Sequence, residues 1–207
     1  MKRQNTKEKI LEKSIDLFYE CGFVKGSIRE LAKRFGMTNS VIYNHFTNKD
    51  EILFTIIKNA GDKTIAKLDD VIKKYDDPEE CLKQMISSML YLFSASVMRK
   101  EIAIFIDELY QLPEDLREIC NKQHRHIFDL FQGKIFELKR KNPINPINEK
   151  VATFGILGAI LWVYHWYRES GLLSIEEIAD ELIKLLFDGL MKADKPIDNK
   201  QERKPKK

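Results

Sequence analysis

Cysteine is scarce in this sequence, and its three positions lie far apart. Cys21, Cys81 and Cys120 form no C-x-x-C pair, the spacing that many zinc sites use. The sequence therefore predicts no metal site and no disulfide framework, and a reduced cytoplasmic setting fits best. The polar start MKRQNTKEKILEKSI lacks the apolar core of a secretion signal, which agrees with a cytoplasmic protein.

Long apolar runs are absent as well. The longest such stretch, residues 154–167, spans about 14 residues and contains His165, whereas a helix that crosses a bilayer needs about 20 apolar residues. This segment is expected to be a buried helix, and no membrane partner is predicted. Proline and glycine are few, at 6 and 9 of 207 residues, while 43% of the residues are hydrophobic. Together these features predict an all-α protein with a helical core.

Recognisable catalytic patterns are also missing. The sequence contains no glycine-rich phosphate loop, no Ser-His-Asp arrangement and no Glu-x-x-His pair for a di-iron bundle. The nearest histidine pair, His124 and His126, is spaced so that the two side chains fall on different faces of a helix. We therefore expect neither an enzyme nor a bound cofactor.

Helix start and stop signals divide the chain into about nine predicted helices. Three capping boxes, in which a Ser or Asn precedes a Glu by three residues, begin helices at Ser27, Asn48 and Ser174. Pro78, followed by two glutamates, is typical of a first helical turn. The predicted helices cover residues 6–21, 27–36, 38–46, 49–75, 78–96, 99–110, 113–141, 148–170 and 174–192.

The predicted helices group into two domains and a tail. The first three make a head (residues 1–47), the others make a helical body (residues 48–194), and the long helix 49–75 is a rigid lever between them. Residues 195–207 are too charged to fold. Residues up to position 50 include ten basic and six acidic side chains, whereas residues 51–194 include 19 and 24. A basic head on an acidic body is suited to docking on phosphates by one end, although charge also varies between segments by chance.

Residues 27–53 have the pattern of a helix-turn-helix. In the first helix Leu31, Ala32 and Phe35 share one face, which predicts contact with a core, and Gly36 permits a tight turn. In the second helix, capped by Thr38, the inward positions are Val41, Ile42 and Phe46, and the outward positions are Asn39, Ser40, Tyr43, Asn44 and His45.

This stretch resembles the helix-turn-helix of the TetR family of one-component regulators. The family pattern is approximately T-x-x-x-I-A-x-x-x-G-V-S-x-x-x-[LI]-Y-x-[HY]-F-x-x-K-x-x-L, and SIRELAKRFGMTNSVIYNHFTNKDEIL matches nearly all of it. The extension Tyr43-x-His45-Phe46-x-x-Lys49 is its most specific part, and Ser27 replaces the usual Thr. The resemblance implies a DNA-binding transcriptional regulator, and most members of the family are repressors.

The outward positions of the head are the candidate DNA contacts. Asn39, Ser40 and Asn44 are short and polar, and an asparagine can pair bidentately with adenine in the major groove. Tyr43 and His45 are expected on phosphate or sugar, although packing within the head is an alternative for both. The full set, to which the resemblance adds Lys49 as a phosphate contact at a helix start, is Ser27, Thr38, Asn39, Ser40, Tyr43, Asn44, His45 and Lys49. The expected partner is a double-stranded DNA operator.

A dimer is expected because one small head offers few contacts to DNA. Two heads related by a two-fold axis would read a palindrome with half-sites about 34–36 Å apart. The resemblance places the dimer interface on the last two helices, 148–170 and 174–192, where small residues let backbones approach and aliphatic residues supply apolar area. Packing within the monomer is an alternative use of the same residues. The candidate interface residues are Gly155, Ile156, Gly158, Ala159, Ile160 and Val163.

The large apolar side chains of the body predict a pocket for a small-molecule effector, although filling the core is the alternative at each position. The segment from Gly158 to Leu190 resembles the acyl-CoA-responsive branch of the family, whose W-x-Y-x-W-Y-R-x-x-G-x-L-S motif is matched from Trp162 to Ser174. This resemblance implies an acyl-CoA thioester of lipid degradation as effector. The possible cations for its phosphates are Lys122, Arg125 and Arg168, and the candidate ligand residues are Met89, Phe93, Phe105, Phe128, Trp162, Trp166 and Arg168.

A second effector class stays open at this stage. Glu101, Asp107 and Glu108 near aromatic residues would suit a lipophilic cation, as in a repressor of an efflux system, although such carboxylates also commonly face solvent. An architectural DNA binder without an effector is a further alternative, which the modest net charge of +3 disfavours.

Overall fold

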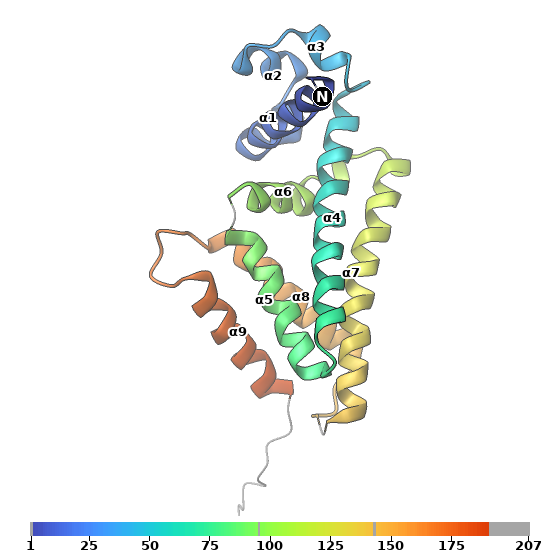
Figure 1. Ribbon diagram of the computed structural model, residues 1–207, viewed down its shortest axis with the longest axis vertical. Helices are drawn as coiled ribbons and strands as arrows, with labels where there is room; N and C mark the ends of the chain where they lie inside the picture. Colours follow the sequence, from blue (N-terminus) through green and yellow to red (C-terminus); the bar gives the residue numbers. More distant parts are fainter. Residues whose placement is uncertain (1, 95, 143, 191–207) are drawn as a thin grey trace, which may run out of the picture.

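The computed structural model describes residues 2–94, 96–142 and 144–190, which form α-helices joined by short connections (Figure 1). Helices α1–α3 make a head at one end of an elongated molecule, and α4 runs from this head along the body. The prediction of an all-α fold with a helix-turn-helix head and about nine helices is confirmed for these residues. The elements are α1 (Lys2–Lys25), α2 (Ile28–Phe35), α3 (Asn39–Tyr43), α4 (Lys49–Lys74), α5 (Pro78–Ser94), α6 (Ser96–Asp107), the 3-10 turn η1 (Leu109–Gln111), α7 (Glu114–Lys141), α8 (Glu149–Trp166) and α9 (Ile175–Leu190).

Some predictions concern residues outside the described part of the chain. These are the charged tail (195–207), the end of the last predicted helix (191–192) and the side chain of Phe93. Across the part that is described, none of the helices has the length and apolar character needed to cross a membrane.

The predicted capping box at the start of α9 is present, and at the start of α4 the cap by Asn48 is present while the Glu51 side chain accepts a hydrogen bond from the N–H of Thr47. Asn48 Oδ1 accepts a hydrogen bond from the backbone N–H of Glu51 at 2.8 Å. Ser174 and Glu177 cap each other, because each side chain accepts a hydrogen bond from the backbone N–H of the other, at 3.2 and 2.8 Å. These contacts satisfy N–H groups that have no partner inside the first helical turn.

Several helix bounds differ from the prediction, among them the end of α3, which lies at Tyr43 and not at Phe46. The sequence predicts that α1 ends at Gly22, but the helix continues past a kink at this glycine, whose φ of 77° and ψ of 160° are not helical. Helix α8 ends at Trp166 and not at Ser170, because Tyr167 takes an extended conformation and buries its side chain. The turn η1 has no counterpart among the predicted helices, and it buries Leu109.

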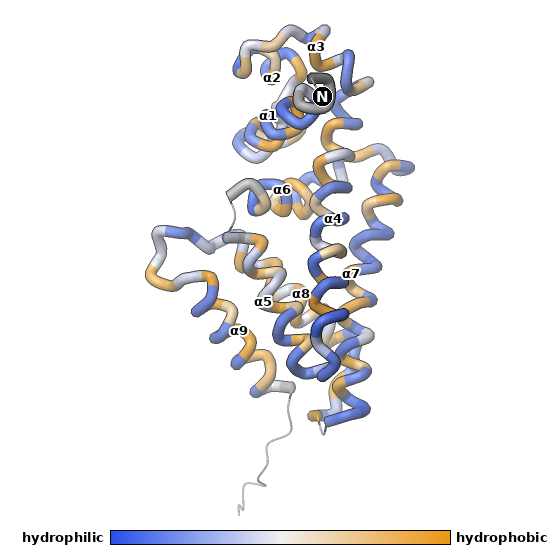
Figure 2. Tube along the Cα trace, viewed as in Figure 1, coloured by the Kyte–Doolittle hydropathy of each residue, from blue (hydrophilic) through white to orange (hydrophobic). Residues whose placement is uncertain are grey.

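The hydrophobic core of the body decides which face of α8 is free. Hydrophobic and hydrophilic positions alternate along α4 and α7 (Figure 2), as expected for helices with one buried side. Helix α8 packs against α7 and α5, and the exposed fractions of Ile156, Ile160 and Val163 fall to 1%, 0% and 2%. These three residues therefore belong to the core of one chain. The prediction that they form a dimer interface is wrong, because the packing within one chain already buries their apolar side chains away from water.

Two polar contacts at the ends of α6 join the head to the body. Near its start, Lys100 Nζ donates a hydrogen bond to Asp16 Oδ1 at 2.7 Å. Directly after its end, Glu108 Oε1 accepts a hydrogen bond from the backbone N–H of Phe23 at 3.0 Å. A Cβ atom at Gly22 would lie 3.2 Å from this carboxylate oxygen, so the glycine leaves room for the contact. Both contacts come from α6 or the residue directly after it, so this part of the body is joined to α1 at two points.

Candidate DNA-binding head and effector cavity

A tight turn between α2 and α3 positions the second helix of the head. The hydroxyl of Ser27 caps α2 by accepting a hydrogen bond from the N–H of Glu30 at 3.0 Å, and Gly36 ends α2 with a φ of 63°. Thr38 caps α3 by accepting a hydrogen bond from the N–H of Val41 at 3.3 Å. Ser27 and Thr38, both predicted DNA contacts, are therefore helix caps. Each hydroxyl keeps its own hydrogen, which it can donate to a phosphate oxygen.

The side chains predicted to face outward from α3 lie on its solvent side. Asn39, Ser40 and Asn44 are exposed, and Tyr43 keeps 53% of its surface in solvent. His45 is half-buried. The head thus presents a short polar and aromatic surface that a DNA groove can reach, while the assignment of each side chain to a base or a phosphate stays a prediction.

Lys49 makes an intramolecular contact and does not extend into solvent. Its Nζ donates a hydrogen bond to the carbonyl oxygen of Phe23 at 2.7 Å and lies 3.9 Å from the centre of the Phe23 ring. Burial lowers the pKa of Lys49 from its usual value. The carbonyl and the ring face stabilise the ammonium group in this partly desolvated place. In this structure Lys49 links α4 to α1, so the predicted phosphate contact would require it to leave Phe23.

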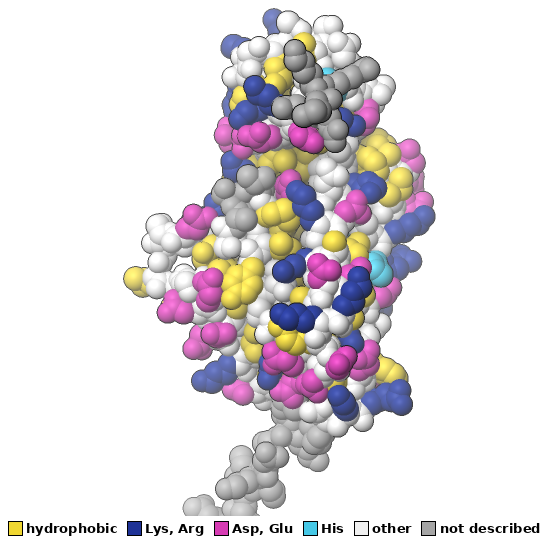
Figure 3. All heavy atoms as spheres, in the orientation of Figure 1, with side chains coloured by type: hydrophobic (Ala, Val, Ile, Leu, Met, Phe, Trp, Pro, Cys, Tyr) yellow, Lys and Arg dark blue, Asp and Glu magenta, His cyan; other side chains and the backbone are white. Residues whose placement is uncertain are grey.

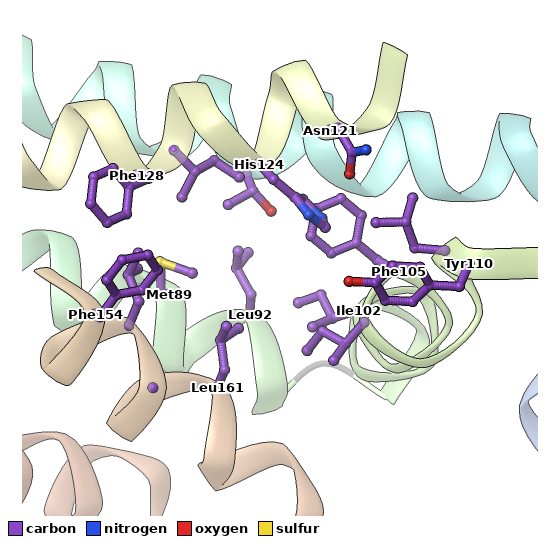
Figure 4. Close-up of a pocket in the computed structure, with 16 residues that line it drawn as sticks. Met89, Leu92, Ile102, Phe105, Tyr110, Asn121, His124, Phe128, Phe154 and Leu161 are labelled. Carbon is purple, nitrogen blue, oxygen red and sulfur yellow. The ribbon is translucent and has the colours of Figure 1, made fainter. Parts of the chain in front are cut away.

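The body encloses a cavity of about 390 Å³ among α4, α5, α6, α7 and α8 (Figure 4). Its volume lies in the range of about 300–1,000 Å³ that is usual for small-molecule sites. Most of its wall is apolar, so burial of an apolar ligand group is the favourable interaction that it offers. The lining residues are Thr64, Met89, Leu92, Ile102, Phe105, Ile106, Leu109, Tyr110, Asn121, His124, Ile127, Phe128, Phe154, Leu157, Gly158 and Leu161.

The polar groups of the cavity gather at one end. Figure 4 shows Tyr110, Asn121 and His124 together at the end next to α6, whereas Phe128 and Phe154 lie towards the opposite end. The cavity therefore has a polar end and an apolar end, and it suits an elongated ligand with the same division.

His124 is the most unusual of these polar residues. Its Nε2 atom is buried and has no hydrogen-bond partner among the described residues. The imidazole contacts the ring of Phe105 edge on, with 4.1 Å between the ring centres. Burial lowers the pKa of His124 below its usual value, so the side chain is neutral at pH 7.

The predicted ligand residues fall into two groups. Met89, Phe105 and Phe128 line the cavity. Trp162 and Trp166 do not, because they lie on the outer side of α8 and keep 64% and 49% of their surface exposed. Neighbouring positions on a helix point about 100° apart, so a shift of one residue separates the outer face of α8 from the cavity. The prediction is wrong for these two tryptophans.

Arg168 is also placed outside this cavity. It lines a second, more polar cavity of about 310 Å³ between α1, α6 and the end of α8. Its guanidinium group donates a hydrogen bond to the carbonyl oxygen of Tyr167 at 2.9 Å. The sequence analysis named Arg168 as a possible cation for the phosphates of coenzyme A, and the structure places it outside the apolar cavity, so this role stays a prediction.

The three carboxylates predicted for a lipophilic cation have other partners. Glu101 accepts hydrogen bonds from Lys63 Nζ at 2.7 and 2.9 Å, and Asp107 accepts one from the hydroxyl of Tyr164 at 2.6 Å. Glu108 binds the head. None of the three is among the described residues that line the apolar cavity, whereas Asp107 and Glu108 line the second, more polar cavity together with Tyr19 and Tyr164.

The sequence analysis missed the polar lining residues Thr64, Tyr110, Asn121 and His124. One signal was available for His124, which precedes the predicted ligand residue Phe128 by four positions. Residues at that spacing lie on one face of a helix, so they face the same cavity.

A helix-turn-helix head joined to a helical body with an apolar cavity defines the class of one-component transcriptional regulators. The chain belongs to the TetR family within this class. The sequence profile described as bacterial regulatory proteins of the tetR family matches residues 10–56. The profile of the tetracyclin repressor-like C-terminal domain matches residues 75–190.

Several known regulators resemble the chain over most of its length. The HTH-type transcriptional repressor KstR2 of Rhodococcus jostii is 20% identical over 190 residues, which cover 91% of this chain and 92% of the relative. The fatty acid metabolism regulator protein of Bacillus subtilis is 23% identical over 184 residues, covering 87% and 93%. Among solved structures, AibR in complex with isovaleryl coenzyme A and operator DNA is 26% identical with a TM-score of 0.82, covering 88% of this chain and 98% of AibR.

Proposed function

We propose that this TetR-family regulator is a dimeric repressor that leaves a palindromic operator when its body binds a coenzyme A thioester. The observation that carries the proposal is the apolar cavity of about 390 Å³, in a body that is similar to AibR, which was solved with isovaleryl coenzyme A and operator DNA. The names of the B. subtilis and R. jostii relatives, a fatty acid metabolism regulator and a repressor, agree with this proposal.

The DNA contact is proposed for the exposed side of α3. Asn39, Ser40 and Asn44 would read base edges in the major groove, and Tyr43 would bind the backbone. The helix caps Ser27 and Thr38 lie at the starts of α2 and α3, where backbone N–H groups and the helix dipole favour a phosphate.

The dimer interface is proposed for the outer face of α8 together with α9. Val151 and Trp162 keep 62% and 64% of their surface exposed, and Leu185 of α9 keeps 71%; Phe154, which also lines the cavity, keeps 59%. Val151 and Phe154 are three residues apart and Phe154 and Trp162 are eight apart, so they lie along one side of α8. An apolar stripe of this kind on a monomer indicates a binding surface. Gly155 and Gly158 are also exposed and would let the partner helix approach closely. The proposed interface therefore includes these glycines but not the buried aliphatic residues of the predicted set.

The acyl group of the effector would occupy the apolar cavity, and the phosphates of coenzyme A would stay outside it. Asn121 lines the cavity and is also exposed, so the cavity reaches the surface at this part of α7. Lys122 and Arg125 are exposed beside it and can supply positive charge to phosphates. A lipophilic cation fits less well, because the lining residues include no Asp or Glu.

Ligand binding would reach the head through α6. Phe105 of α6 lines the cavity, and Glu108, three residues later, holds the N–H of Phe23. An acyl group that displaced α6 would move α1 and change the separation of the two recognition helices. A coupling of about 1–3 kcal/mol, which lowers DNA affinity by roughly 5–150-fold, is enough for an inducible repressor.

The test is to find the operator and then measure its affinity with and without candidate effectors. Genomic fragments that bind the purified protein are selected and sequenced, and the enriched motif is used in fluorescence anisotropy. We expect a palindrome, and weaker binding in isovaleryl-CoA or octanoyl-CoA but not in free coenzyme A. A response to tetraphenylphosphonium alone would contradict the thioester and support a regulator of efflux. Equal binding to all fragments would contradict an operator-specific regulator.

A further inference from the structure

His124 carries an inference about the chemistry of the effector, and this inference rests on the proposed function. The Nε2 atom of His124 is buried and has no hydrogen-bond partner in the described part of the chain. A buried polar atom without a partner destabilises a folded protein by an amount similar to a lost hydrogen bond. Native proteins leave few such atoms, and a functional role in binding is a common reason for keeping one.

The position of the imidazole supports a role in binding. The ring lines the cavity beside Tyr110 and Asn121 (Figure 4). Its contact with Phe105 is an edge-on ring contact, which satisfies no hydrogen bond of the buried nitrogen. The torsion that turns an imidazole about its Cβ–Cγ bond is soft. Binding through Nε2 would use a rotation about this bond that turns the nitrogen towards the cavity.

The surroundings decide the charge of the group that His124 would bind. The other polar side chains on the wall are those of Thr64, Tyr110 and Asn121, which carry no charge, and the lining includes no Lys, Arg, Asp or Glu. An ionised carboxylate or an ammonium group would therefore enter without a compensating charge, which is strongly unfavourable in an apolar cavity. A neutral oxygen needs only a hydrogen bond.

We infer that His124 is the polar anchor of the cavity and binds an uncharged oxygen of the acyl group of the effector. That oxygen is either the thioester carbonyl or an oxo or hydroxyl group farther along the acyl chain. The apolar end of the cavity near Phe128 and Phe154 then takes the hydrocarbon part. His124 thus selects among thioesters of similar size by their oxygen content.

The test compares pairs of probes that differ in one oxygen. Octanoyl-CoA against the thioether S-octyl-CoA tests the thioester carbonyl, and 3-oxooctanoyl-CoA or 3-hydroxyoctanoyl-CoA against octanoyl-CoA tests a chain oxygen. Butyrophenone against butylbenzene asks the same question without coenzyme A. Dissociation constants are measured by calorimetry for the full-length wild-type protein, for H124L, for H124Q, and for H126Q as a control at an exposed position of the same helix.

In at least one pair, wild type and H126Q should prefer the probe with the extra oxygen, and H124L should bind that probe about five- to tenfold more weakly, a typical effect of one hydrogen bond. H124L should bind the other probe as wild type does. H124Q, whose amide can replace the hydrogen bond, should keep most of the preference. Equal weakening of both probes in H124L would show a role in packing only and overturn the inference.

The remaining outcomes separate the inference from the proposed function. One outcome is that no coenzyme A probe binds, while wild type prefers butyrophenone over butylbenzene and H124L does not. The proposed effector class then fails, and the role of His124 stands. If thioesters bind with no preference in any pair, the proposed function stands and the inference fails. If no probe binds the wild type, both fail. Should H124L not fold, the apolar variant H124M takes its place in the same comparison.

Discussion

The carboxylate of Glu108 accepts a hydrogen bond of 3.0 Å from the backbone N–H of Phe23, and so ties the end of α6 to the last turns of α1. The carbonyl oxygen of the same residue, Phe23, accepts a hydrogen bond from Lys49 at the start of α4. Phe23 of the head is therefore held on one side by Glu108, directly after α6, and on the other side by Lys49 of the lever helix α4. The surface of the molecule is shown from one side in Figure 3, where basic and acidic side chains both surround the junction of head and body.

Loss of the Glu108 carboxylate should uncouple the cavity from the head. We expect E108A to lower the free energy of unfolding by about 1–3 kcal/mol, because the N–H of Phe23 loses a charged partner. The ratio of operator affinities with and without effector should move towards one. E108Q keeps an acceptor oxygen and should restore part of the ratio, while E118A, at an exposed position of α7, serves as control. An unchanged ratio in E108A would exclude this contact from signalling.

The contact of Lys49 with Phe23 gives a test of what Lys49 does. We expect K49M to lower the free energy of unfolding by about 1–2 kcal/mol, since it removes a hydrogen bond and a cation–ring contact. The dependence of operator affinity on salt concentration should stay as in wild type. A phosphate contact would instead reduce that salt slope by about one, so titrations at several salt concentrations distinguish the two roles.

The exposed asparagines of the head should control sequence preference. If Asn39 or Asn44 pairs with a base, its replacement by alanine weakens operator binding by about 1–3 kcal/mol and relaxes selectivity at one base position. Anisotropy with single-base variants of the operator measures both effects. R29A, which removes an exposed cation of α2, should weaken binding to all sequences alike. If N39A and N44A also weaken binding to all sequences alike, the two asparagines contact the DNA backbone and not the bases.

The exposed face of α8 predicts how the chain dimerises. W162E places a charge in the centre of this face and should produce a monomer in light scattering, because an unpaired charge is strongly unfavourable in a buried interface. Operator affinity should fall with it, since two linked heads bind more tightly than one. F136E is the matched control: Phe136 of α7 is 52% exposed and is not part of the proposed interface, and its replacement should leave the dimer intact.

Burial of His124 predicts a contribution to acid sensitivity. The pKa of His124 in the folded protein lies below the ordinary value of 6.5, so well above pH 6.5 the side chain is neutral in both the folded and unfolded states. As the pH falls below 6.5 the unfolded state binds the proton first, and the free energy of unfolding decreases until the folded pKa is passed. Each unit between the two pKa values corresponds to about 1.4 kcal/mol.

Urea denaturation between about pH 5 and pH 7.5 checks this contribution. Wild type and the control H126Q should lose more stability on acidification than H124Q, which has no imidazole to protonate. Parallel curves for wild type and H124Q would show that the pKa of His124 is not lowered in the folded protein.

Local features of the fold were predictable from the sequence because local chemistry determines them. The helix caps at Asn48 and Ser174, the turn at Gly36 and the outward side of α3 depend on residues within one or two helical turns of each other. The family pattern of residues 27–53 added the DNA-binding class. The kink in α1 lies at Gly22, the residue where the sequence predicts the end of this helix. Glycine permits either a kink or a helix end, because it adopts backbone conformations that other residues avoid.

Only the tertiary structure decided which face of α8 is buried and which residues enclose the cavity. Ile156 and Trp162 are both apolar residues of one helix, and nothing in their spacing says which of them meets α5 and α7. Likewise Phe128 and His124 share a cavity with Phe105 because α6 and α7, distant in the sequence, pack together. Helical periodicity determines which side chains share a face of a helix. The element that covers this face depends on how all the helices pack together to bury their apolar side chains.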